Sequence, residues 1–319
     1  NNWGTGFAID DIQVGALPDY DITLLSPLQF LPGNRNNAGT SYSIIPLSQI
    51  TNTAVNFYGI LKNTGVNTLD SARLNVELVG NTFTSESDIF IIESIMQDST
   101  FCNDAFTPIE IGQYSANLNA SSGNSLITTD QTTSFEVSEF IYARDLAQNS
   151  DDFTGGVFIN NEGTEERGNA FDIYTNADLY GVRFRVHPLT TPNAMAKINI
   201  NSLDIQTGEI SFLSESSYKR VGSITNDWID IAFDMPIPLN QGEVIIATLY
   251  AEYNDIDSVA ICINGNSNGG ASYIQDFDGL NGNNPGTWLG SPTAPMLRLN
   301  FDPNIQGIGD PVNINEIEK

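Results

Sequence analysis

One histidine limits the acid–base chemistry open to this chain of 319 residues. His187 stands between Val186 and Pro188, at the end of an expected strand and just before a turn. A nucleophilic triad needs a base, usually histidine, to accept the proton of the attacking hydroxyl. A structural role at a strand end explains His187 without catalysis. We therefore predict that the chain is not an enzyme, and leave the question open for a longer precursor.

Cysteine and carboxylate chemistry give no stronger sign of catalysis. Cys102 and Cys262 are the only cysteines, so a disulfide framework and an ordinary zinc or iron site are excluded. Cys262 lies in an apolar run and is expected to be buried, although a bridge between the two cysteines stays open. With 39 acidic residues, some carboxylate pair will always have the spacing of a glycoside hydrolase, so that spacing indicates nothing.

A loop rich in oxygen ligands suggests calcium as a cofactor. Calcium takes six to eight oxygen ligands from carboxylates, amides and carbonyls. Asp276, Asp278, Asn281 and Asn283 supply such oxygens at short spacing, with glycines between them. The glycine position does not fit an EF-hand, and a polar hairpin loop is the alternative interpretation. A weaker second candidate is the acidic pair at residues 10–11.

Three aromatic residues of the C-terminal half are candidates for sugar binding. Sugar rings stack on exposed aromatic faces while amides and carboxylates bond their hydroxyls. Trp288, Tyr273 and Tyr253 lie in or beside loops rich in glycine and asparagine. Ordinary packing of these rings is the alternative. Trp228 begins an apolar alternation and is expected in the core.

The charge of the chain excludes several classes of partner. Lys and Arg number 12 against 39 Asp and Glu, which gives a net charge of -27. Binding to nucleic acid or to anionic lipid depends on clustered basic residues, so we predict neither. No apolar run approaches the roughly 18 residues of a membrane span. The acidity serves solubility outside the cell or, alternatively, the collection of divalent cations.

Alternating apolar residues predict an all-β fold. In the first half, one series is Leu74, Val76 and Leu78, and another runs through Val55, Phe57 and Ile60. A period of two places one strand face in a core and the other in water. Turn residues separate these runs at the spacing of a β-sandwich.

A second set of alternating runs follows in residues 142–301. Residues 244–249 are apolar on both faces and predict a central strand. Pro236 and Pro238 are expected in a connection, because proline lacks the N–H that a central strand needs. Residues 137–146 are the only weak candidate for a helix, so helix content should be low.

Several short motifs resemble modules of secreted proteins from Bacteroidetes-type bacteria. Residues 3–14 (WGTGFAIDDIQV) resemble the last strand of an adhesin-type jelly roll. Residues 62–65 (KNTG), with the FTP and GQY motifs near residues 106–114, resemble an adhesion-related Ig-like module. The motifs at 142–145, 168–172 and 294–301 resemble a neighbouring jelly-roll module, and residues 314–319 are similar to the spacer before a type IX secretion sorting domain.

The resemblance implies a fold of tandem antiparallel β-sandwiches, Ig-like followed by jelly roll. Residues 1–17 are expected to be the terminal strand of an upstream sandwich plus a linker. Residues 18–138 are expected to form the Ig-like sandwich and residues 139–303 the jelly roll. Residues 304–319 are expected to be an extended linker before a removed sorting domain. The chain would then be an internal piece of a longer precursor.

The same resemblance implies export, so we expect the protein to be secreted or attached to the bacterial cell surface. The type IX secretion machinery would be a partner during export, and a glycan or a cell-surface protein afterwards. We predict adhesion or carbohydrate binding by the jelly roll, with the Ig-like module as spacer. The alternatives are accessory modules of a secreted hydrolase, or a structural cargo protein without a small ligand.

Overall fold

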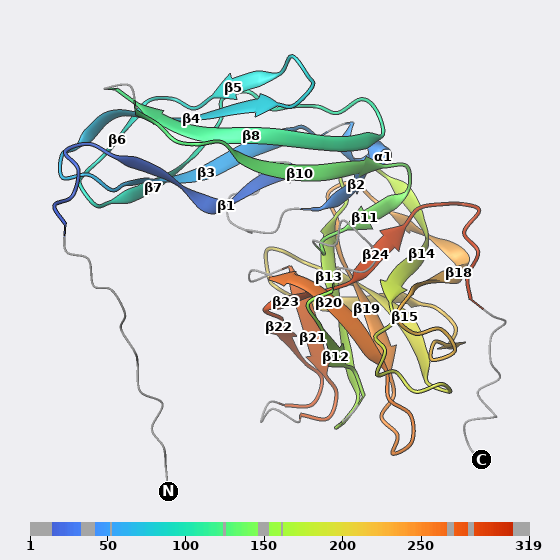
Figure 1. The fold of residues 1–319 in the computed structure, drawn as a ribbon. Coiled ribbons are helices and arrows are strands. Elements are labelled where there is room, and N and C mark those ends of the chain that lie inside the picture. Colours follow the sequence, from blue (N-terminus) through green and yellow to red (C-terminus); the bar gives the residue numbers. More distant parts are fainter. Residues whose placement is uncertain are drawn as a thin grey trace, which may run out of the picture.

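The chain folds almost entirely into β-strands. The computed structural model describes residues 15–32, 42–51, 53–123, 126–145, 153–160, 162–266, 271–279 and 284–308. Within these ranges the one helix is α1 (Leu47–Ile50), and the strands pair antiparallel except for residues 44–46, which run parallel to residues 136–138. The predicted fold class and the low helix content are confirmed. Figure 1 shows two sandwiches, which we call the first sandwich (residues 22–138) and the second sandwich (residues 141–300).

The first sandwich packs a three-stranded sheet on a larger one. The smaller sheet has the order β1 (Ile22–Pro32), β3 (Val55–Asn63) and β7 (Gln97–Phe101). The larger sheet has the order β2 (Ile44–Pro46), β10 (Gln131–Ser138), β8 (Gly112–Ser122), β4 (Leu69–Leu78) and β5 (Thr84–Glu86). Beside β4 and β8 lie β6 (Phe90–Ile92) and β9 (Leu126–Ile127).

The burial of the first sandwich follows the predicted alternation. Leu74, Val76 and Leu78 are buried along β4, with partly or fully exposed residues between them. On β3 the inward series continues at Leu61 and not at Ile60, because the strand keeps its period of two without a bulge there. One face of each strand therefore forms the core and the other faces water.

The second sandwich contains the remaining strands. One sheet has the order β18 (Trp228–Leu239), β14 (Ala177–Arg185), β24 (Leu297–Asn300) and β11 (Ile141–Ala143). The seven-stranded sheet has the order β16 (Ile210–Glu215), β15 (Met195–Leu203), β19 (Val244–Ala251), β13 (Glu165–Asp172), β21 (Ser272–Asp276) and β22 (Thr287–Gly290), with β17 (Lys219–Arg220) beside β15. A short sheet adds β12 (Gly155–Phe158), β20 (Ala260–Asn266) and β23 (Thr293–Pro295).

The strand predicted to be central is confirmed, but the connection before it is not. β19 pairs with β13 on one side and β15 on the other. Pro236 and Pro238, which we expected in a connection, lie inside β18. This prediction was wrong because β18 is the terminal strand of its sheet, where a residue without an N–H is tolerated. Residues 141–143 of the weak helix candidate likewise form a strand, β11.

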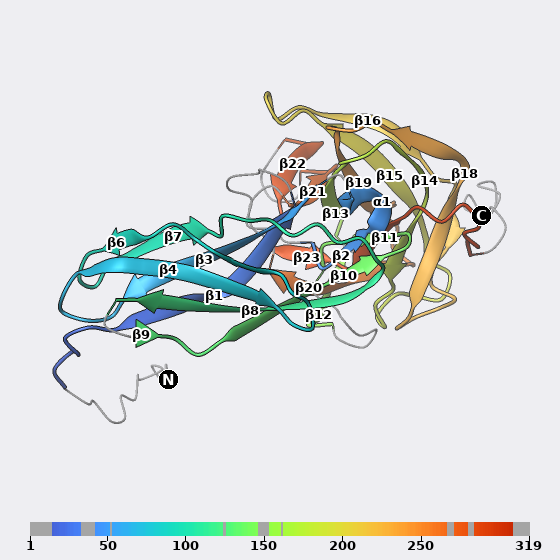
Figure 2. The ribbon, with the colours of Figure 1, turned by 90° about the horizontal axis from the view of Figure 1, so that it is seen from above.

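The two sandwiches share one continuous sheet and one hydrophobic core. β11 pairs with β2 of the first sandwich and with β24 of the second, and the main core cluster contains residues of both. Figure 2 shows α1 and β2 against the strands of the second sandwich. The side-chain amide of Gln49, in α1, donates to the carbonyl of Thr175 at 3.0 Å.

A buried polar group closes this junction. The Tyr42 hydroxyl donates to Asp172 at 2.7 Å, and the Arg144 guanidinium donates to the Tyr42 oxygen at 2.6 Å. The Tyr42 and Tyr142 rings lie 4.5 Å apart. Burial raises the pKa of Tyr42 well above its usual value, so its hydroxyl stays a donor. Residues far apart in sequence thus hold the two sandwiches as one body.

Some predictions concern parts of the chain that the structure leaves undescribed. The motifs at 3–14 and 314–319 and the acidic pair at 10–11 lie outside the described residues. The predicted division at residues 138 and 139 stays a prediction. In the described part of the chain, no helix has the length and apolarity needed to cross a membrane.

Candidate functional site

The seven-stranded sheet has one face in the main core and a second face with mixed side chains. On β19, Ile245 and Ala247 belong to the main core, whereas Val244 and Ile246 belong to a separate small cluster. Directly opposite residues of neighbouring strands share a face. The register of β13, β15, β19, β21 and β22 therefore identifies the residues of this second face, which we call the outer face.

Two of the three predicted sugar-binding aromatics meet on the outer face. Tyr273 lies on β21 and Trp288 on β22, with ring centroids 6.4 Å apart and planes at 79°. Both rings are half-buried and pack on the small cluster of Ala170, Val244 and Ile246. Packing therefore holds this aromatic pair in place while leaving part of each ring in solvent.

Tyr253 lies elsewhere, in the loop that follows β19. Its ring is exposed, and its hydroxyl donates to Asp255 at 2.8 Å. Sequence reasoning grouped the three aromatics because all lie near polar loops, but the register places only Tyr273 and Trp288 together. A role for Tyr253 stays a prediction.

Glycines flank Tyr273 on both neighbouring strands. Tyr273 is opposite Gly168 on β13 and Gly290 on β22. A Cβ added at Gly168 would lie 1.8 Å from the carbonyl oxygen of Ala247, so only glycine fits there. At Gly290 an added Cβ would meet nothing within 4 Å. No directly opposite side chain therefore covers the Tyr273 ring.

Polar side chains occupy the middle of the outer face. Asn199 on β15 is opposite Thr248 on β19, and Glu166 on β13 is opposite Tyr250. The Asn199 side-chain amide donates to the Glu166 carboxylate at 2.5 Å. Glu166 is 1% exposed and Asn201, two residues along β15 from Asn199, is 5% exposed. The centre of this face is thus a buried polar group.

Burial raises the pKa of Glu166 above its usual 4.5, against the opposing effect of hydrogen bonds from Asn199 and Thr248 and of the Lys197 charge. The native state therefore holds this proton more tightly than the unfolded chain, so the contribution of Glu166 to the free energy of unfolding falls as pH rises above about 4.5. Glu166→Gln should melt like wild type near pH 4.5 and increasingly higher than wild type toward neutral pH. Calorimetry across this range measures it, with the exposed Glu77→Gln as control. A difference in melting temperature between Glu166→Gln and wild type that does not change with pH would contradict the raised pKa of Glu166.

A cation and further aromatics lie at the β15 end of the outer face. Lys197 forms an ion pair with Glu215 at 2.6 Å, and its ammonium nitrogen lies 4.8 Å from the centroid of the Tyr250 ring. The Tyr250 and Phe277 rings meet edge to face at 5.4 Å. From β22 to β15 there are four strand-to-strand steps of about 4.8 Å each. The outer face can therefore offer a ligand aromatic surface at its ends and polar atoms between.

Sequence reasoning missed Glu166, Asn199 and Asn201. The alternating runs predicted strands in this half of the chain, but no local pattern marked the polar residues beside Ile198 and Ile200 as buried. The signal that could have found them is the use of asparagine, and not Lys or Glu, at successive outward positions of one strand.

Of the four predicted calcium ligands, the structure describes Asp276 and Asp278, and both accept hydrogen bonds from backbone N–H groups. Asp276 is fully buried and accepts from the backbone N–H groups of Asp278 and Gly279. Asp278 accepts from the N–H of Thr164 at 2.7 Å. Asn281 and Asn283 lie outside the described residues. Among the described residues no group of three His, Cys, Asp or Glu side chains could hold a metal. The hydrogen bonds of Asp276 are sufficient to form this turn without a cation. Calcium binding stays a prediction.

The calcium prediction has a direct test. A cation bound only by the folded protein stabilises it by mass action, so millimolar calcium should raise the melting temperature. Asp278→Asn should reduce the rise without abolishing the turn. An unchanged melting temperature would remove the metal assignment, and an equal rise with magnesium would indicate nonspecific screening of the acidic surface.

His187 and the cysteines take structural positions. The His187 ring meets the Phe153 ring edge to face at 5.6 Å, and partial burial lowers its pKa. Its Nδ1 accepts from the N–H of Leu189 at 3.3 Å. Cys102 and Cys262 are both buried and not bridged. Burial raises the pKa of Cys262 to about 11, which keeps it a thiol.

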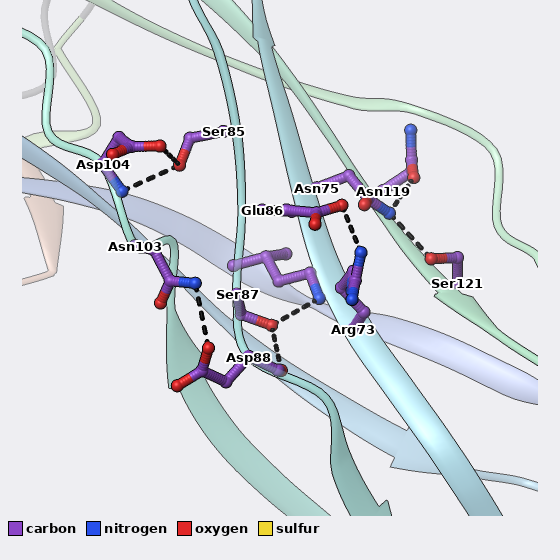
Figure 3. A network of polar contacts seen from close by, with 11 residues as sticks. Arg73, Asn75, Ser85, Glu86, Ser87, Asp88, Asn103, Asp104, Asn119 and Ser121 are labelled. Carbon is purple, nitrogen blue, oxygen red and sulfur yellow. Dashed lines mark hydrogen bonds and ion pairs between the residues drawn. The ribbon is translucent and has the colours of Figure 1, made fainter.

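The first sandwich carries a polar groove that sequence reasoning did not identify. It has a volume of about 410 Å³ and lies where β4, β5 and β8 present their solvent-facing residues. Asn75 donates to Asn119 and Ser121, each at 2.9 Å (Figure 3). Asn119 in turn donates to Asp130 at 2.9 Å. Asn75 and Asn119 thus donate within the groove, which is also lined by the carboxylates of Glu77, Glu86, Asp104 and Asp130.

Comparison with known proteins gives only distant likenesses. No protein-family model matches the chain, and no curated protein is similar to it. A structure of carbohydrate-binding modules from the β-sandwich superfamily has a TM-score of 0.24 and 11% identity, covering 76% of this chain and 96% of that one. A two-domain protein of unknown function from Bacteroides fragilis has a TM-score of 0.23 and 10% identity, covering 73% and 94%. No residue role follows from scores this low.

Proposed function

We propose that this protein binds carbohydrate, without catalysis, through the outer face of the second sandwich. The observation that carries the proposal is the half-buried Tyr273–Trp288 pair beside the buried polar group of Glu166 and Asn199. Aromatic faces stack on the apolar side of a sugar ring, while amides and carboxylates bond its hydroxyls. The outer face brings both kinds of group within one sheet.

The first sandwich serves in this proposal as a stiff spacer. Its sheet and core are continuous with those of the second sandwich, so the two bodies keep a fixed relation. A rigid support places the outer face at a defined distance from whatever anchors the chain. This spares the ordering entropy that a flexible linker would lose on binding.

A glycan-array screen of the full chain, followed by titration of its best hit, tests the proposal. Trp288→Ala should weaken binding at least about 30-fold, the size of an aromatic hot spot. Phe101→Ala, an exposed aromatic change on the first sandwich, is the matched control and should leave binding unchanged. Equal melting temperatures show that both variants fold. A blank array, or a hit insensitive to Trp288→Ala, would overturn the proposal.

We further propose that the protein is secreted or held on the bacterial cell surface. The support is the strongly acidic composition together with the resemblance to exported modules. Surface labelling and fractionation of the producing cells should find it outside the cytoplasm. Retention inside the cell would overturn this part while leaving the binding proposal intact.

A further inference from the structure

Two buried polar atoms of the outer face have no hydrogen-bond partner among the described residues. They are the side-chain oxygen of Asn199 and the side-chain nitrogen of Asn201. The two residues are 7% and 5% exposed. They stand two positions apart on β15 and therefore point to the same side of the sheet.

Unpaired atoms of this kind are rare because they lose their bonds to water and gain nothing in return. Two other nearby polar atoms have partners. Asn199 Nδ2 donates to the Glu166 carboxylate, and the Thr248 hydroxyl donates to the backbone carbonyl oxygen of Asn199 at 3.3 Å. The Asn201 amide faces the Glu166 carboxylate closely enough to lower its pKa, but its Nδ2 does not meet hydrogen-bond geometry with that carboxylate or with any other described acceptor. One unpaired acceptor and one unpaired donor thus lie beside a single carboxylate.

We propose that Asn199 Oδ1 and Asn201 Nδ2 bind the hydroxyl groups of an uncharged sugar, one accepting a hydrogen bond and the other donating one. This inference rests on the proposed function and specifies its ligand class. A hydroxyl both donates and accepts, so neighbouring hydroxyls complement an unpaired acceptor and an unpaired donor together. A sulfated or uronic sugar would bring further negative charge to a chain whose net charge is -27, which Coulomb repulsion opposes.

Both atoms are closed to solvent in the free protein, so a neighbouring side chain must rotate before a sugar reaches them. Lys197 is two residues from Asn199 on β15 and is the long, flexible side chain of this part of the face. It is held by Glu215 and by the Tyr250 and Tyr218 rings, which lie 4.8 Å and 5.3 Å from its nitrogen. Its charge also acts on Glu166, so in this proposal its rotation exposes the polar group from the Glu166 side.

Asn201→Leu separates a binding role from a purely structural one. Leucine has nearly the shape of asparagine and removes the unpaired nitrogen, so the variant should melt higher than wild type. It should also bind neutral oligosaccharides at least about tenfold more weakly, the loss of one good hydrogen bond. Asn75→Leu, which removes a satisfied amide in the groove of the first sandwich, is the control. It should melt lower and bind as wild type does.

The outcomes distinguish this inference from the function on which it rests. Weakened binding with a raised melting temperature supports it, as does a preference of the wild type for neutral over uronic oligosaccharides. Unchanged binding by Asn201→Leu, with Trp288→Ala still defective, overturns the inference and leaves the proposed function standing. A wild type that binds no glycan overturns both.

Discussion

Arg144→Met should destabilise the whole protein by about 3–5 kcal/mol, the cost of removing one partner of a buried ion pair. Arg144 lies at the junction, 3.4 Å from Asp172 and against the ring of Tyr42. Methionine fills much of the volume but leaves Asp172, which is 8% exposed, without its cationic partner. Urea unfolding at equilibrium measures the loss. The exposed Arg73–Glu86 pair supplies the control, and Arg73→Met should cost less than about 1 kcal/mol.

The junction also predicts how the protein unfolds. Because one sheet and one core run through both sandwiches, they should unfold in a single transition. Trp228 and Trp288 report on the second sandwich, and a Trp3→Phe background confines the fluorescence to them. Far-ultraviolet circular dichroism reports on both sandwiches. Coincident curves are expected, and two separated transitions would contradict the shared core.

Gly168→Ala should cost about 3 kcal/mol or more, because its methyl group meets backbone and cannot be accommodated by a side-chain rotation. The Ala247 carbonyl oxygen and the Thr248 Cα stand 1.8 Å and 2.6 Å from the added atom. β13 and β19 would have to separate in the middle of the seven-stranded sheet. Chemical denaturation measures the effect.

Gly290→Ala is the matched control for this substitution. Gly290 flanks the same tyrosine from the opposite side, and an added methyl there meets nothing. Its stability should stay within about 0.5 kcal/mol of wild type. Equal effects of the two alanines would mean that the β13–β19 approach is not as tight as described.

Local patterns predicted most of the fold because burial repeats along a strand. Leu74, Val76 and Leu78 alternate in sequence and alternate in burial. Residues 244–249 are apolar except for Thr248 and lie between two neighbouring strands. The prolines of β18 misled the prediction because an edge strand and a connection tolerate proline for the same reason.

The site was only partly predictable, since its members come from strands whose pairing no local pattern reveals. Trp288 and Tyr273 lie near the same loops, so sequence alone could group them. Glu166 and Asn199 are 33 residues apart and meet because β13 and β15 both border β19. The contact of Tyr42 with Asp172 spans 130 residues and was likewise beyond sequence reasoning.

Hydrogen–deuterium exchange of the full chain, with and without a saturating neutral oligosaccharide, tests the central claim most directly. Ligand on the outer face should slow exchange in β13, β15, β19, β21 and β22, and leave β4 and β8 of the first sandwich unchanged. Trp288→Ala should abolish that protection at the same ligand concentration. Protection confined to the first sandwich, or none in the outer-face strands while the sugar is bound, would contradict the claim that this face is the carbohydrate site.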